Sequence, residues 1–198
     1  MNADQLELKS CLEKARGFHG DLCAGIVLGT RMAILGLKAI GIEDPCGKDR
    51  KNIVVYTEID RCATDAILAV TGCHPGKRTM KILDYGKMAA TFINLATGKA
   101  VRIVARDKQA DPKKEYSPDM ARQEPDTERY TSVPAEDLFE VREVEVDMRP
   151  EDMPGRPLRV VACSVCGEGI LDMREIVKDG RTLCKPCAEG RTYWREKK

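Results

Sequence analysis

Hydrophobic residues recur at helical and strand spacings along the first 148 residues of the chain. Near the start, leucines among charged residues predict a helix over residues 4–16 that ends at Gly17. A longer apolar stretch predicts a second helix, which begins near His19–Asp21 and runs to about Ile40. Further along, apolar runs between turn residues predict a short helix from residue 60 or 61 to 70 and strands over 52–59, 80–83, 88–95, 100–105 and 139–148. This order predicts an α+β domain whose mixed or antiparallel sheet is packed by helices.

Three glycines lie inside the second predicted helix: Gly25, Gly29 and Gly36. A glycine in a helix interior costs about 1 kcal/mol relative to alanine. We therefore expect another segment of backbone to pack closely against this face of the helix.

The rest of the chain is more polar. Residues 107–134 are highly charged and contain four prolines, which predicts one or two short helices on the surface. Residues 149–157 contain three prolines and are expected to form a linker. The predicted organisation is a core domain over residues 1–148, the linker, and a small domain over residues 158–198.

Composition narrows the class of protein. The chain has 198 residues and a formal net charge of +1, so no global field draws it to nucleic acid or to a membrane. Charged residues interrupt its most apolar stretch, residues 22–42, and its first residues are too charged for a signal peptide. We therefore expect no membrane association and a cytoplasmic location. In that reducing compartment, nine cysteines favour metal or redox chemistry over a disulfide framework.

Four of these cysteines are spaced as a C-terminal zinc site. Two Cys-x-x-Cys pairs are separated by seventeen residues: Cys163, Cys166, Cys184 and Cys187. Gly167 can take the positive φ that such a knuckle needs, and Asp179-Gly180 predicts a hairpin between the pairs. A helix that carries the second pair would complete a treble-clef finger. Four thiolates leave no coordination position open, so the expected role of this zinc ion is structural.

A second constellation lies near the N-terminus. His19 and Cys23 are four residues apart, so in one helix they would share a face. Cys23 and Cys62 both fall at predicted helix starts, where the helix dipole should lower the pKa of a thiol. These three residues could bind one metal ion with an open position, as catalytic sites do. In the alternative interpretation, His19 caps a helix and both cysteines are small buried hydrophobic residues.

Cys73 is a less favourable ligand for the same ion. If the helix after Cys62 is straight, Cys73 lies roughly 16 Å from Cys62. Only a shorter helix and a loop that folds back would bring the two sulfurs together. Cys11 and Cys46 are expected to be incidental.

Four short motifs, taken together, resemble the FmdE family of formylmethanofuran dehydrogenase. They are Phe18-His19-Gly20-x-x-Cys23-x-Gly25, Glu58-Ile-Asp-Arg-Cys62-x-x-Asp65-Ala66, Thr71-Gly72-Cys73-x-x-Gly76-Lys77 and Asp84-Tyr85-Gly86-Lys87-Met88-Ala89. The resemblance implies an α+β core with a treble-clef appendage, often dimeric, and a metal-binding cleft built from the His and Cys positions. Members often have His where this chain has Asp21, which could still ligate or hydrogen-bond.

Three functions compete at this point. The first is a metal-binding protein of this family with an accessory or uncharacterised enzymatic role in one-carbon or molybdenum/tungsten enzyme metabolism. It acts as a homodimer, in contact with a molybdenum or tungsten oxidoreductase or another enzyme complex. Its candidate catalytic residues are Cys23, Cys62, Asp65 and Lys77, around a second transition metal.

The second function is a metal carrier or sensor without turnover. The third is a regulator that binds nucleic acid or protein through the basic finger. Residues 174–198 carry eight Lys/Arg against four Asp/Glu, but a solvated basic surface explains this equally. Nucleic acid is disfavoured because aromatic residues make up only 5% of the chain.

Overall fold

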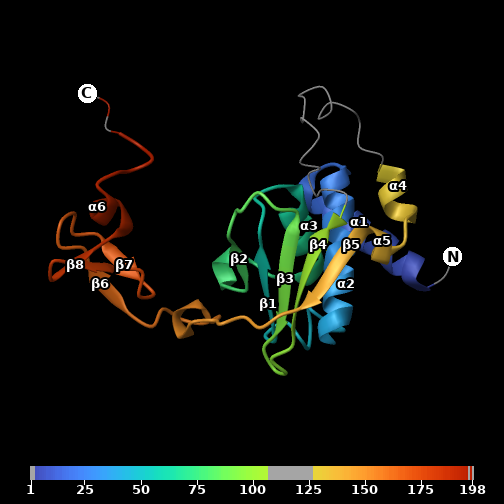
Figure 1. Ribbon diagram of the computed structural model, residues 1–198, viewed down its shortest axis with the longest axis horizontal. Helices are drawn as coiled ribbons and strands as arrows, with labels where there is room; N and C mark the ends of the chain where they lie inside the picture. The colour runs from blue at the N-terminus through green and yellow to red at the C-terminus, as the bar shows by residue number, and fades with distance from the viewer. Residues whose placement is uncertain (1–2, 107–126, 196, 198) are drawn as a thin grey trace. The chain divides into compact units, whose positions relative to one another are not determined.

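The computed structural model describes residues 3–106, 127–195 and 197 (Figure 1). The chain divides into two compact units, Met1–Val146 and Asp147–Lys198. Each unit has its own secondary structure and is described by itself.

The N-terminal unit begins with two helices joined by a tight turn. The first helix, α1 (Ala3–His19), continues past Gly17, where it was expected to end, and the second, α2 (Ala24–Ile40), begins later than expected. Gly20 separates them because its φ of 109° cannot continue a helix, and Cys23 is extended before α2 starts. His19 and Cys23 therefore belong to different helices.

A five-stranded mixed sheet forms the second layer of this unit. In chain order its strands are β1 (Ile53–Thr57), β2 (Met80–Ile82), β3 (Ala89–Asn94), β4 (Ala100–Ala105) and β5 (Phe139–Glu143), arranged as β2-β1-β3-β4-β5. Only the β1–β2 pair is parallel. The predicted mixed sheet is confirmed, although β1 and β5 are shorter than the expected 52–59 and 139–148.

A third helix, α3 (Cys62–Thr71), connects β1 to β2 with the help of the short 3-10 helix η1 (Pro75–Lys77). The close packing expected from the glycines of α2 is confirmed. A Cβ at Gly29 would lie 2.5 Å from the Ala63 carbonyl oxygen of α3, and one at Gly36 would lie 2.4 Å from the Phe92 ring of β3. Helix α2 is thus wedged between α3 and the sheet, and the core fills the space around it.

Two short helices follow the part of the expected charged segment that lies outside the described residues, 107–126. These are α4 (Thr127–Ser132) and α5 (Ala135–Leu138), which agree with the expected short helices. The Arg31 guanidinium of α2 donates hydrogen bonds to the carbonyl oxygens of Tyr130 and Val133, both at 2.6 Å. This contact anchors the end of α4 to α2.

The C-terminal unit is made of short elements in two hairpins and a helix. They are η4 (Pro150–Asp152), β6 (Val160–Ala162), β7 (Gly169–Leu171), β8 (Ile176–Lys178), β9 (Arg181–Leu183) and α6 (Lys185–Glu189). Asp179 and Gly180 have φ of 53° and 70°, which confirms the predicted hairpin turn. Asp172 and Met173 are also left-handed, so residues 170–177 form two strands rather than one.

The segment expected to be a linker, residues 149–157, contains η4. Asp152 accepts hydrogen bonds from Arg149 and from Arg174, both at 2.8 Å, and Arg174 precedes β8. Residues 150–152 are therefore tied to the finger. No helix in the described ranges 3–106 and 127–195 is long and apolar enough to cross a membrane.

Candidate metal centres

Three predicted ligands meet where α1 ends and α2 and α3 begin. His19 is the last residue of α1, Cys23 caps α2, and Cys62 is the first residue of α3. Their ligand atoms all lie within 4.8 Å of one another, and all three residues are half-buried. The structure brings the predicted trio together, but the assumption that His19 and Cys23 share one helix was wrong. The turn at Gly20 places them side by side instead.

Gly25 allows the first turn of α2 to approach Cys62. A Cβ at Gly25 would lie 2.9 Å from the Cys62 Cβ and 3.6 Å from the Cys23 sulfur. Real Cβ atoms are essentially never found as close as the first of these distances, so only glycine fits here without movement. The absence of a side chain at this position keeps the two sulfurs together.

Carboxylates hold the His19 ring on both sides. His19 Nδ1 donates a hydrogen bond of 2.8 Å to Oδ2 of Asp65, which lies in the first turn of α3. Because a carboxylate accepts this bond, Nδ1 keeps its proton and Nε2 is the nitrogen available to a metal ion. Asp21 Oδ1 lies 3.3 Å from Nε2, and its side chain is 77% exposed. Asp65 therefore positions His19, and Asp21 stands at the solvent side.

The Cys62 thiol differs from the expectation. Its predicted position at a helix start is correct, but its pKa is raised rather than lowered. Burial is the largest cause, followed by the hydrogen bond and the negative potential of the neighbouring Cys23, while Asp65 adds a smaller unfavourable charge. These effects outweigh the helix dipole. Two thiols and a carboxylate gathered this closely need a bound cation before they can all be ionised.

Cys73 and Lys77 do not join this site. Helix α3 runs unbroken from Cys62 to Thr71, about 15 Å long, so Cys73 lies beyond its far end. The Cys73 sulfur is buried in the core, 4.0 Å from the Ile53 carbonyl oxygen, and burial raises its pKa to about 11. Lys77 is exposed in η1 and acts electrostatically on Cys73. The possible role of Cys73 as a fourth ligand and of Lys77 in catalysis is therefore corrected.

Sequence reasoning missed one buried ion pair close to the site. Glu58 lies between β1 and Cys62 and is 7% exposed. Its carboxylate accepts two hydrogen bonds from the Arg102 guanidinium of β4, at 2.6 and 2.8 Å. The Glu58 carbonyl oxygen also accepts the backbone N–H groups of Tyr85 and Lys87. The signal was a glutamate directly after a buried strand, and the pair fixes the segment that leads into Cys62.

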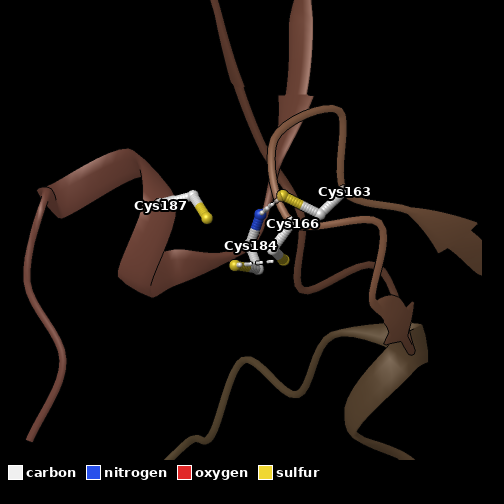
Figure 2. Close-up of side chains that lie close together, drawn as sticks. All are labelled: Cys163, Cys166, Cys184 and Cys187. Carbon is white, nitrogen blue, oxygen red and sulfur yellow. Dashed lines mark hydrogen bonds between the residues drawn. The ribbon is translucent and has the colours of Figure 1, made fainter. Parts of the chain in front are cut away.

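The second cluster lies in the finger. The four sulfurs of Cys163, Cys166, Cys184 and Cys187 lie within 4.8 Å of one another. Figure 2 shows Cys187 on α6 directing its sulfur toward the knuckle cysteines, and Cys184 at the start of the same helix. The Cys184 backbone N–H donates to the Cys163 sulfur at 3.3 Å, and the Cys166 and Cys184 sulfurs are 3.8 Å apart. Gly167, with φ of 76°, allows the first knuckle to turn.

The four thiols of the finger are electrostatically unequal. Backbone N–H groups of Cys166, Cys184 and Val165 stabilise the Cys163 thiolate and lower its pKa to about 6. Hydrogen bonding with Cys184, together with burial, raises the pKa of Cys187 to about 12. One thiolate is therefore present at neutral pH, and a cation would be needed to ionise the whole set. Knuckle, hairpin and short helix follow one another as predicted for a treble-clef finger, although α6 ends at Glu189 because Gly190 is left-handed.

Comparison with known proteins identifies both parts of the chain. The family described as "FmdE, Molybdenum formylmethanofuran dehydrogenase operon" matches residues 18–147. The family described as "Prokaryotic dksA/traR C4-type zinc finger" matches residues 156–193. The first match includes all three residues of the N-terminal cluster, and the second includes all four cysteines of the finger.

Two individual proteins extend this likeness. A relative from Archaeoglobus fulgidus, described as a probable S-adenosyl-L-methionine-binding protein, is 28% identical over 203 residues. The match covers 93% of this chain and 54% of that protein, so the chain spans about half the length of this relative. A solved structure of an FmdE-like protein of tungsten formylmethanofuran dehydrogenase from Syntrophus aciditrophicus is 21% identical, with a TM-score of 0.59 over 94% of this chain and 95% of that one. This likeness confirms the predicted α+β fold.

Proposed function

Because the chain belongs to the FmdE family and carries a C4-type zinc finger, we propose that it holds two metal ions with different roles. A divalent transition metal ion, zinc being the best fit, binds in the N-terminal unit to His19, Cys23 and Cys62. That site keeps one coordination position for a substrate or water. A structural zinc ion binds to the four cysteines of the finger.

The observation that supports the first site is the mutual approach of its three ligand atoms. Around one tetrahedral zinc ion, two sulfurs or a sulfur and a nitrogen are separated by about 3.5–3.8 Å. The observed upper limit of 4.8 Å is within a small side-chain movement of that geometry. One imidazole and two thiolates form a donor set that suits zinc and related borderline-soft ions. Three protein ligands are also the number found in catalytic zinc sites.

The surrounding residues give this site a chemistry. When bound, the ion would supply a Lewis acid that polarises a substrate oxygen or lowers the pKa of a bound water. Asp65 keeps Nδ1 of His19 protonated and its ring oriented. Asp21, on the solvent side of His19 Nε2, is placed to accept a proton from a molecule at the open position.

The biological setting of this chemistry rests on the family. We place the protein in one-carbon or molybdenum/tungsten enzyme metabolism, as a cytoplasmic homodimer that assists an oxidoreductase or another enzyme complex. The description of the matching family and that of the Syntrophus aciditrophicus structure support this placement. A metal carrier or sensor is the alternative within the same site, and it would exchange its ion with a partner without turnover.

A second candidate function comes from the Archaeoglobus fulgidus relative, whose description names S-adenosyl-L-methionine. The match covers nearly all of this chain, so a site for that ligand could lie within it. Equilibrium dialysis of the full chain with labelled S-adenosyl-L-methionine tests this directly. Saturable binding would support it, and retention no greater than that of an unrelated protein would exclude it.

Metal content per chain tests the proposed function. Inductively coupled plasma mass spectrometry should find about two ions on the intact chain, since each site holds one. The Cys23→Ser/Cys62→Ser and Cys163→Ser/Cys166→Ser variants should each lose one ion, whereas Cys46→Ser, an exposed cysteine outside both clusters, should retain two. An intact chain whose metal is unaffected by Cys23→Ser/Cys62→Ser would contradict the N-terminal site.

A further inference from the structure

A long groove runs along α1 toward the N-terminal cluster. Its volume is about 370 Å³. One wall is α1 itself, and the other is formed by Leu22, just before Cys23, and by Thr131 of α4. The lining residues contributed by α1 are Gln5, Leu8, Lys9, Leu12, Glu13 and Arg16.

The spacing of these residues shows how the groove is oriented. They recur every three or four positions, so they share one face of α1, and Gln5 and Arg16 are about 16 Å apart along the helix axis. Arg16 lies one turn before His19, and Leu22 directly precedes Cys23. One end of the groove therefore adjoins the three-ligand cluster, and the other end leads away from it.

The lining of the groove is apolar along its length and cationic at the end near the cluster. Leu8, Leu12 and Leu22 line it, and Leu22 is 41% exposed. The Arg16 guanidinium makes no ion pair with any residue in the described parts of the chain. An accessible guanidinium at the end of an apolar channel is complementary to a carboxylate that carries a hydrocarbon tail.

We propose that this groove binds a monocarboxylate with a linear hydrocarbon tail. Its carboxylate would lie at Arg16 beside the three-ligand cluster, and its tail along Leu12 and Leu8. The inference rests on the proposed function, because it defines the class of substrate that the open position would face. The long, narrow shape suits an extended chain, and the position of the cation determines which end of the ligand reaches the cluster.

Isothermal titration of the zinc-loaded full chain with butanoate, hexanoate and octanoate tests the proposal. Affinity should rise about fourfold with each added methylene as the tail covers more leucine surface. Arg16→Gln should weaken octanoate binding about tenfold, because a charge-assisted hydrogen bond is lost. The same variant should leave the weaker binding of 1-octanol unchanged.

Matched variants separate the groove from the general surface. Leu22→Glu should weaken octanoate binding about tenfold, because it places a charge in the channel. Leu6→Glu, an exposed leucine of α1 outside the lining, and Lys14→Gln, a cation of α1 outside the lining, should bind as the wild type does.

Three results would overturn the proposal. The first is octanoate binding that is equal in all variants, which would mean nonspecific adsorption. The second is no octanoate binding by a chain that contains both metal ions, which would leave the proposed function standing and remove this inference alone. The third is a dimer in analytical ultracentrifugation that Leu22→Glu dissociates, which would assign the groove to a second copy of the chain. Loss of metal from the wild type would instead contradict the proposed function itself.

Discussion

At the scale of single residues, the N-terminal site depends on what each ligand touches. His19 is held through Nδ1 by Asp65, and Cys62 has a raised pKa because it is buried beside Cys23. The residue types and their order along the chain were sufficient to predict the three ligands. The orienting role of Asp65 and the raised pKa of Cys62 were not predictable, because both depend on contacts between α1 and α3 that residue spacing does not report.

Asp65 offers the most direct test at this scale. Asp65→Ala should lower the affinity of the N-terminal site for zinc about 10–100-fold, because the His19 ring loses its orienting carboxylate. Competition with a chromophoric chelator measures the effect. Asp60→Ala is the control, since Asp60 is exposed and lies outside the cluster. Equal affinities of the two variants would show that Asp65 does not position His19.

Cys73 provides a pH-dependent prediction. Its thiol has a pKa of about 11 in the folded chain, against an ordinary value of 9.0. The unfolded chain therefore loses this proton first as the pH rises, and the free energy of unfolding should fall between about pH 9 and pH 11. Cys73→Ala should reduce this pH dependence in urea titrations at pH 8, 9 and 10. A slope that is the same in the variant would contradict the assignment.

At the scale of secondary-structure elements, glycines determine where helices stop and how closely they pack. Apolar periodicity predicted the type and order of most elements. It could not predict their ends, which depend on left-handed residues such as Gly20, Asp172 and Met173. A left-handed Asp or Met in particular leaves no signal in a hydrophobic pattern. The glycines of α2 were more informative, because their cost within a helix pointed to the close contact with α3 and β3.

Two glycine substitutions should therefore have opposite effects on stability. Gly29→Ala should lower the free energy of unfolding by about 1–3 kcal/mol, because its Cβ would lie 2.5 Å from a backbone oxygen of α3. Gly17→Ala should raise it by about 0.5–1 kcal/mol, because nothing lies within 4 Å of its Cβ and alanine favours the helix. Urea denaturation of both variants checks the signs. A destabilised Gly17→Ala, or an unaffected Gly29→Ala, would contradict this account of the packing.

At the scale of the whole molecule, two units carry two kinds of site. The motifs of residues 18–105 and the spacing of the late cysteines were enough to predict the family and the finger. The strand order β2-β1-β3-β4-β5 was not predicted, because alternation along each strand does not reveal its neighbours. The groove along α1 also escaped sequence reasoning, since Thr131 joins it only through the fold.

Removal of metal should affect the two units differently. The described buried cluster of the finger is small: Cys163, Ile170 and Leu183. Without zinc this unit should unfold, while the N-terminal unit should stay folded around its larger core. Hydrogen exchange after chelation should therefore show lost protection in β7 and β9 and retained protection in α2. Protection retained in both units would mean that the finger folds without its ion.

The central claim is that the N-terminal site keeps one coordination position open, and cobalt spectroscopy tests it most directly. The full chain is loaded with Co²⁺ in place of zinc and titrated with azide. We predict a change in the visible d–d absorption that Cys23→Ser/Cys62→Ser abolishes and Cys46→Ser retains, because the four cysteines of the finger leave no position for azide. A cobalt-loaded chain whose spectrum azide leaves unchanged would contradict the open site.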